Sequence, residues 1–219
     1  GVFRRQRQMC IRDSFISLSI SSQDTYLQCG KVIDTERGKV LKKKTIIVSS
    51  DKIVAIKNGY VSSENPLDIV IDLKSKTVMP GLIDLHVHIE SEFNPQKYMN
   101  AFTANDADIA FGSLKFAEIT LMAGFTTVRD LGGTGINISL RDAIAKGEVV
   151  GPRIFTAGKA IGTTGGHADP TNGWKNSLRG DPGPKEGVIN SVDDAKKAVR
   201  QRYKDGADNI KITATGGVM

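Results

Sequence analysis

The sequence predicts an α/β protein in two parts: a small β module over residues 24–80 and a set of parallel βα units over residues 81–219. The first observation is a series of short Val- and Ile-rich runs before Pro80, separated by turn residues and without a helical period. The second is a regular alternation of strand-like and helix-like segments after Pro80, which is typical of parallel βα units.

Composition is that of an ordinary globular protein. The 219 residues are 39% hydrophobic and 25% charged, with two cysteines, which excludes a disordered chain and a disulfide scaffold. No apolar run reaches the ~18 to 20 residues that would span a bilayer. The formal net charge is +6, but half of the excess lies in the first fourteen residues, and aromatic residues do not interleave with a basic stripe. We therefore expect neither a nucleic-acid nor a membrane partner.

Residues 1–23 belong to neither part. Residues 1–14, which include Cys10, have no strand or helix period and look like a non-native start, similar to translated sequencing-adapter sequence. Residues 15–23 resemble the remnant of a secretory signal peptide, with a short β-strand as the alternative. Export to the periplasm and a cytoplasmic location both stay open.

The β module is expected to be a small sandwich-type structure. Its strands are predicted at Lys31–Asp34, Thr45–Ser49, Lys52–Ile56 and Ile69–Leu73. None of its residues forms a recognisable chemical site, so we expect its role to be structural.

The second part is predicted as alternating strands and helices. The expected strands are Leu82–Val87, Phe125–Asp130, Arg153–Ala157 and Asn209–Thr213, and the expected helices are Leu114–Ala123, Ile138–Lys146 and Ser191–Tyr203. A Gly- and Pro-rich stretch from residue 158 to about 190 is long for a simple connection, which favours a functional loop. The alternation stops after the fourth strand.

The strongest chemical signal is the run Pro-Gly-Leu-Ile-Asp-Leu-His-Val-His that ends at His88. Alternate side chains of a strand share a face, so Asp84, His86 and His88 are expected on one side. Two adjacent imidazoles are good zinc ligands, whereas a pair of structural histidines is the alternative. Because βα-barrel enzymes place active-site groups at the ends of their strands, we favour metal ligation.

Four further stretches accompany this motif: residues 123–130 (AGFTTVRD), 151–153 (GPR), 163–167 (TTGGH) and 209–217 (NIKITATGG). Together these residues resemble the metal-dependent amidohydrolase superfamily, and within it the branch of imidazolonepropionase-like and Xaa-Pro dipeptidase-like enzymes. The resemblance implies an incomplete (β/α)8 TIM barrel of about four βα units, preceded by a β-sandwich-type module. It also implies an N-terminal fragment of a longer enzyme.

The resemblance further implies a two-metal site with zinc as the expected ion. His86 and His88 would hold one ion, and Lys211 would be N-carboxylated and bridge both. Burial near cations favours the neutral amine that reacts with carbon dioxide, and the resulting carboxylate offers one oxygen to each ion. The alternative for Lys211 is a solvated or ion-paired lysine at a strand end.

His167 would point into the barrel mouth, where it would act as a catalytic and substrate-binding residue that polarises the scissile carbonyl. The alternative is a surface-loop histidine. Trp174 is expected either to wall this pocket or to serve in packing, and Arg129 and Asp130 to form an ion pair or to support the site from behind. Residues 132–135 resemble a phosphate-binding loop only faintly, because they lack its Gly-Lys-Ser/Thr ending.

The expected function is that of a metal-dependent hydrolase of amide C–N bonds, with an Xaa-Pro-type dipeptide or similar small molecule as substrate and a homo-oligomer as a compatible state. The alternatives are an imidazolonepropionase-like cyclic amidohydrolase and a non-catalytic binding protein on the same fold. A mononuclear enzyme is disfavoured, because a bridging Lys211 implies a second ion. A half-barrel would expose the edges of its strands, so we expect the 219-residue chain alone to be inactive, poorly soluble or self-associating.

Overall fold

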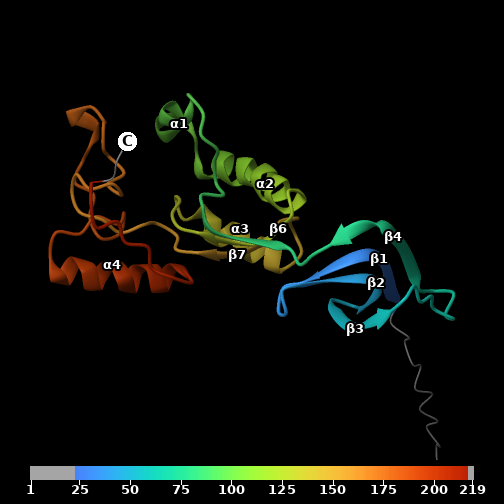
Figure 1. Ribbon diagram of the computed structural model, residues 1–219. Helices are drawn as coiled ribbons and strands as arrows, with labels where there is room; N and C mark the ends of the chain where they lie inside the picture. The colour runs from blue at the N-terminus through green and yellow to red at the C-terminus, as the bar shows by residue number, and fades with distance from the viewer. Residues whose placement is uncertain (1–22, 217–219) are drawn as a thin grey trace, which may run out of the picture. The chain divides into compact units, whose positions relative to one another are not determined.

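The computed structural model describes residues 23–216 (Figure 1). The expected non-native start and signal remnant, up to residue 22, lie outside these residues. The described chain divides into two units, one ending at Pro80 and the other beginning at Gly81. None of the helices within residues 23–216 is both long and apolar enough to cross a membrane.

The first unit contains one four-stranded sheet in the order β3-β2-β1-β4. The strands are β1 (Asp24–Asp34), β2 (Lys39–Ser49), β3 (Lys52–Asn58) and β4 (Ile69–Val78). β1 pairs antiparallel with β2 and parallel with β4, and Cys29, Val32 and Ile46 form its buried core. The described residues of this unit form this single sheet, so the second layer of a sandwich stays a prediction.

The second unit is built on a three-stranded parallel sheet in the order β5-β6-β7. The strands are β5 (Leu82–Val87), β6 (Phe125–Asp130) and β7 (Arg153–Thr156), and the helices are α1 (Lys97–Thr103), α2 (Asp106–Met122), α3 (Ile136–Ala145) and α4 (Val192–Asp205), with a short 3-10 turn, η1 (Asn176–Leu178). Helices α2 and α3 contact each other and the sheet, around a core that includes Val128, Leu140 and Ile154. This arrangement confirms the α/β class, whereas closure into a barrel stays a prediction.

Local sequence explains where the helices begin. Helix α2 begins at Asp106, well before the predicted start at Leu114, because the Asp108 carboxylate accepts the backbone N–H of Asn105 at 2.8 Å, which is one half of a capping box. Helix α4 begins after Ser191, whose hydroxyl accepts the N–H of Asp194 at 3.1 Å, as the sequence predicts. It ends at Gly206, which adopts a φ of 92°.

The predicted fourth strand over Asn209–Thr213 is wrong. Within the described chain this segment forms only an isolated parallel bridge between Ile161 and Ile212. The backbone N–H of Thr156, at the end of β7, donates to the carboxylate of Asp208 at 2.9 Å. The Asp208 carboxylate therefore takes the place of a backbone carbonyl of a neighbouring strand, and regular strand pairing stops there.

Candidate active site

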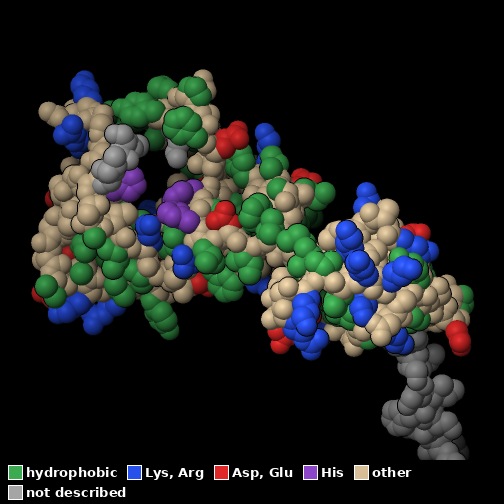
Figure 2. Space-filling model, in the orientation of Figure 1, with side chains coloured by type: hydrophobic (Ala, Val, Ile, Leu, Met, Phe, Trp, Pro, Cys, Tyr) green, Lys and Arg blue, Asp and Glu red, His purple; other side chains and the backbone are tan. Residues whose placement is uncertain are grey.

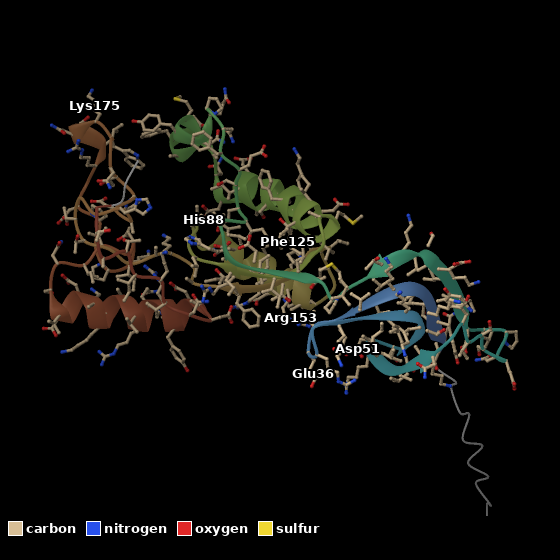
Figure 3. All side chains as sticks on the ribbon, viewed as in Figure 1. Glu36, Asp51, His88, Phe125, Arg153 and Lys175 are labelled. Carbon is tan, nitrogen blue, oxygen red and sulfur yellow. The ribbon has the colours of Figure 1, made fainter. Side chains whose placement is uncertain are left out.

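One cavity of about 880 Å³ lies at the carboxyl end of the parallel sheet. His86, His88, His167 and Lys211 all line it, together with residues that directly follow β6 and β7. Figure 3 shows His88 at one end of the sheet, while Phe125 and Arg153 mark the starts of their strands at the other end. In Figure 2 the histidine side chains gather around a hollow of this unit. The cavity therefore brings together the four predicted metal-ligating and catalytic residues.

The paired histidines come from the end of β5. The centroids of the His86 and His88 rings are 5.5 Å apart. His88 Nδ1 lies 2.7 Å from the carbonyl oxygen of Gly132. A carbonyl only accepts hydrogen bonds, so Nδ1 carries the proton and Nε2 keeps a lone pair for a ligand. Asp84 instead accepts the backbone N–H of His86 at 2.9 Å and does not line the cavity.

Asp130 fixes the backbone around His88. Its carboxylate is fully buried and accepts the N–H groups of Ile89 and Gly132, each at 3.1 Å. Ile89 follows His88, and Gly132 supplies the carbonyl that receives the His88 ring. Burial raises the pKa of Asp130, and the backbone N–H groups oppose this effect only in part. Asp130 therefore supports a predicted ligand from behind, through two backbone segments.

The predicted alternative of an ion pair between Arg129 and Asp130 is wrong. Arg129 is exposed and donates from Nε to the carbonyl oxygen of Leu85 at 2.8 Å. No ion pair joins Arg129 to Asp130 in the described part of the chain. The physical reason is the pleat of the strand, which directs neighbouring side chains to opposite faces.

A buried carboxylate fills the glycine-rich loop after β6. Glu90 accepts the N–H of Thr134 at 2.6 Å and that of Asn137 at 2.8 Å, at the start of α3. A Cβ on Gly133 would lie 2.6 Å from the Glu90 carboxyl group, so a larger residue there would push the carboxylate away from its N–H partners. The protein's own acid thus occupies the position that an anion would take at a helix N-terminus. Sequence reasoning missed Glu90, although its place just after the histidine pair was a usable signal.

The loop that carries His167 is held by Asp169. This buried carboxylate accepts the N–H of Gly165 at 2.8 Å and both the N–H and the hydroxyl of Thr171, at 2.9 and 2.7 Å. Burial alone would raise the pKa of Asp169, but these donors outweigh it and the pKa is lowered. The N–H of His167 points to the carbonyl oxygen of Thr215 at 3.4 Å, so the loop meets the segment that contains Lys211.

Lys211 is half-buried in the cavity wall. Its carbonyl oxygen accepts the N–H of Ile161 at 2.8 Å, and Ile161 in turn accepts the N–H of Thr213 at 2.8 Å. These bonds hold Lys211 beside the segment that leaves β7, although no regular strand forms there.

The donors in the cavity suit a divalent metal, with one condition. Two adjacent imidazoles, one with a free Nε2, are typical zinc ligands. Among residues 23–216, however, no cluster of three His, Cys, Asp or Glu side chains is arranged to hold a metal ion. A complete site therefore needs a further donor; Lys211 is the predicted one, and acidic residues line the same cavity as well.

Charged and aromatic residues complete the wall, and sequence reasoning missed most of them. The charged ones are Asp106, Lys159, Arg179, Asp181 and Glu186. Trp174 lines the cavity and also packs on Phe102, so both roles considered for it from the sequence apply. The signal that could have found the others is the length of the 158–190 loop, which supplies four of the five.

The chain is similar to several known proteins. The sequence model of the amidohydrolase family matches residues 77–219. Ochratoxinase of Aspergillus niger is 29% identical over 246 residues, covering 96% of this chain and 48% of that protein. A solved Xaa-Pro dipeptidase with methionine bound in its active site is 46% identical, with a TM-score of 0.83 over 90% of this chain and 48% of that one. A solved prolidase complexed with N-methylphosphonate-L-proline is 36% identical, with a TM-score of 0.70 over 87% and 46% of the two chains. The chain thus spans about half the length of these relatives.

Proposed function

The chain belongs to the amidohydrolase family, and from this premise we propose that the whole protein is a metal-dependent hydrolase of amide C–N bonds with an Xaa-Pro-type dipeptide as substrate. One observation carries the proposal: a single cavity is lined by His86, His88, His167 and Lys211. The likeness to a solved Xaa-Pro dipeptidase supports the choice of substrate, and the methionine bound in that relative supports a ligand of amino-acid size.

Each of the four residues has a proposed role. His86 and His88 hold one divalent ion, with zinc the expected metal, and the hydrogen bond to Gly132 keeps the His88 ring in the tautomer that can ligate. Lys211 would help to hold a second ion through a carboxylate on its amine; the neutral amine would form an N–C bond with carbon dioxide and release one proton. Bound ions would supply Lewis-acid activation of the scissile carbonyl and of water. His167 donates a hydrogen bond to the carbonyl oxygen of the substrate and orients it.

The test uses the full-length protein that contains this chain, loaded with zinc, and measures proline release from Met-Pro. We expect turnover, about two zinc ions per chain, and a loss of activity of about 100-fold or more in His88→Ala. His167→Asn should lower turnover while the zinc content stays unchanged. A zinc-loaded protein that opens cyclic amides but leaves dipeptides intact would refute the dipeptidase assignment, and one that binds dipeptides without turnover would indicate a binding protein.

We also propose that the activity needs more than these 219 residues. Size-exclusion chromatography with light scattering should show the isolated chain self-associating, because β5 and the segment around Ile212 would present unpaired edges. Rapid dipeptide hydrolysis by a monomeric 219-residue chain would contradict this expectation.

A further inference from the structure

Trp174 is the one tryptophan of the chain, and it lines the cavity that holds the histidines and Lys211. It is half-buried and belongs to the long loop after β7. Proline and alanine side chains of the same loop, at Ala168, Pro170 and Pro182, line the cavity as well. These side chains give the wall apolar surface beside its charged and metal-ligating groups.

The indole is braced by helix α1, which lies far away in sequence. The ring centroids of Phe102 and Trp174 are 4.7 Å apart, and those of Tyr98 and Phe102 are 5.3 Å apart in an edge-on arrangement.

The backbone on each side of the indole is held too. The hydroxyl of Tyr98 donates to the carbonyl oxygen of Gly173 at 3.2 Å, and Arg179 Nε donates to that of Trp174 at 2.8 Å. These contacts hold the indole ring in place in the absence of a ligand. Less conformational entropy is therefore lost when a ligand binds.

We propose that Trp174 is a specificity-determining residue that forms an apolar subsite for the side chain of the substrate's N-terminal residue. The proposal rests on the proposed function, in which the polar amide group is held by the histidines and the metal donors. The proline ring is common to all Xaa-Pro dipeptides, so the apolar group that varies among them is the side chain of the N-terminal residue, and a rigid aromatic wall gains most from contact with an aliphatic or aromatic one.

The experiment compares kcat/KM for Leu-Pro and Gly-Pro in the zinc-loaded full-length protein. We expect Leu-Pro to exceed Gly-Pro by about 10-fold or more. Trp174→Ala should abolish the preference for Leu-Pro while changing Gly-Pro by less than about 3-fold. Trp174→Phe, which keeps a ring, should retain part of the preference. Leu178→Ala is the matched control, because Leu178 is an exposed apolar residue of the same loop that does not line the cavity.

A second readout separates this proposal from the proposed function. Tryptophan emission of the wild type minus that of Trp174→Phe isolates the signal of Trp174, and added leucine should change it while glycine should not. If no dipeptide is hydrolysed but leucine changes the emission, the dipeptidase assignment fails and the subsite stands. The subsite is overturned if dipeptides are hydrolysed and Trp174→Ala lowers the turnover of Leu-Pro and of Gly-Pro equally. It is also overturned if the variant lowers the turnover of neither dipeptide. Should Trp174→Ala not fold, as judged by circular dichroism, the fluorescence comparison decides alone: an emission that leucine leaves unchanged overturns the subsite.

Discussion

Replacing Asp130 by asparagine tests how the fold holds His88. Asparagine keeps one acceptor oxygen but turns an NH₂ group toward the other of the two backbone N–H groups, on Ile89 or Gly132. A buried donor left unpaired costs about 1 to 3 kcal/mol, so we expect the free energy of unfolding to fall by about 2 kcal/mol. Because Gly132 holds the His88 ring, zinc affinity should also fall, by about 10- to 100-fold.

Zinc affinity is measured by chelator competition on the full-length protein, and stability by denaturant titration. The matched control is Asp208→Asn. The Asp208 carboxylate accepts the N–H of Thr156 at 2.9 Å and pairs with Arg141 at 2.8 Å, but it contacts nothing around His88. Asp208→Asn should lower the free energy of unfolding and leave the zinc affinity unchanged. If Asp130→Asn binds zinc as tightly as the wild type, or if both variants lose zinc affinity equally, Asp130 does not position His88.

Three further predictions follow from the same contacts. Lys211→Ala should lower the zinc content from about two ions to about one, as measured by mass spectrometry of the metal; two retained ions would exclude Lys211 as a bridge. Glu90→Gln removes a charge from the N-terminus of α3 and turns an NH₂ group toward the N–H of Thr134 or of Asn137, so the free energy of unfolding should fall by about 2 kcal/mol in denaturant titrations, and an unchanged value would argue against this role. The lowered pKa of Asp169 stabilises the His167 loop above the unfolded-state pKa of about 3.9, and this stability is lost as the pH falls through the folded-state pKa. Amide exchange at Gly165 and Thr171, corrected for its intrinsic pH dependence, should therefore lose protection below about pH 4, and protection that does not change would contradict it.

The periodicity of the sequence predicts the sheet of the second unit well, because buried strands and amphipathic helices leave distinct patterns. Leu82–Val87 and Phe125–Asp130 have the predicted bounds, and α3 and α4 lie close to theirs. Helix α1 was missed, since its seven residues are too few to show a period. The apolar residues Ile210 and Ile212 resemble a strand, but pattern alone does not reveal whether a partner strand is present to pair with them.

The candidate site was predictable where residue type dictates the chemistry. His86 and His88 stand out as a histidine pair at the end of a recognisable strand, whereas the roles of His167 and Lys211 came from the resemblance to the amidohydrolase superfamily; the structure places all four in one cavity. The supporting groups were not predictable in the same way. Glu90 acts on backbone N–H groups more than forty residues away, and such pairings depend on tertiary geometry that local pattern does not encode.

The proposed metal site of His86, His88 and Lys211 is tested most directly by a crystal structure of the zinc-loaded full-length protein, with an anomalous difference map recorded at the zinc edge. We expect one peak in contact with the ring nitrogens of His86 and His88. A second peak should lie nearby, with carboxylate density that extends beyond Nζ of Lys211 between the two peaks. The proposed site would be contradicted by a Lys211 side chain whose density ends at Nζ, or by zinc peaks outside the cavity.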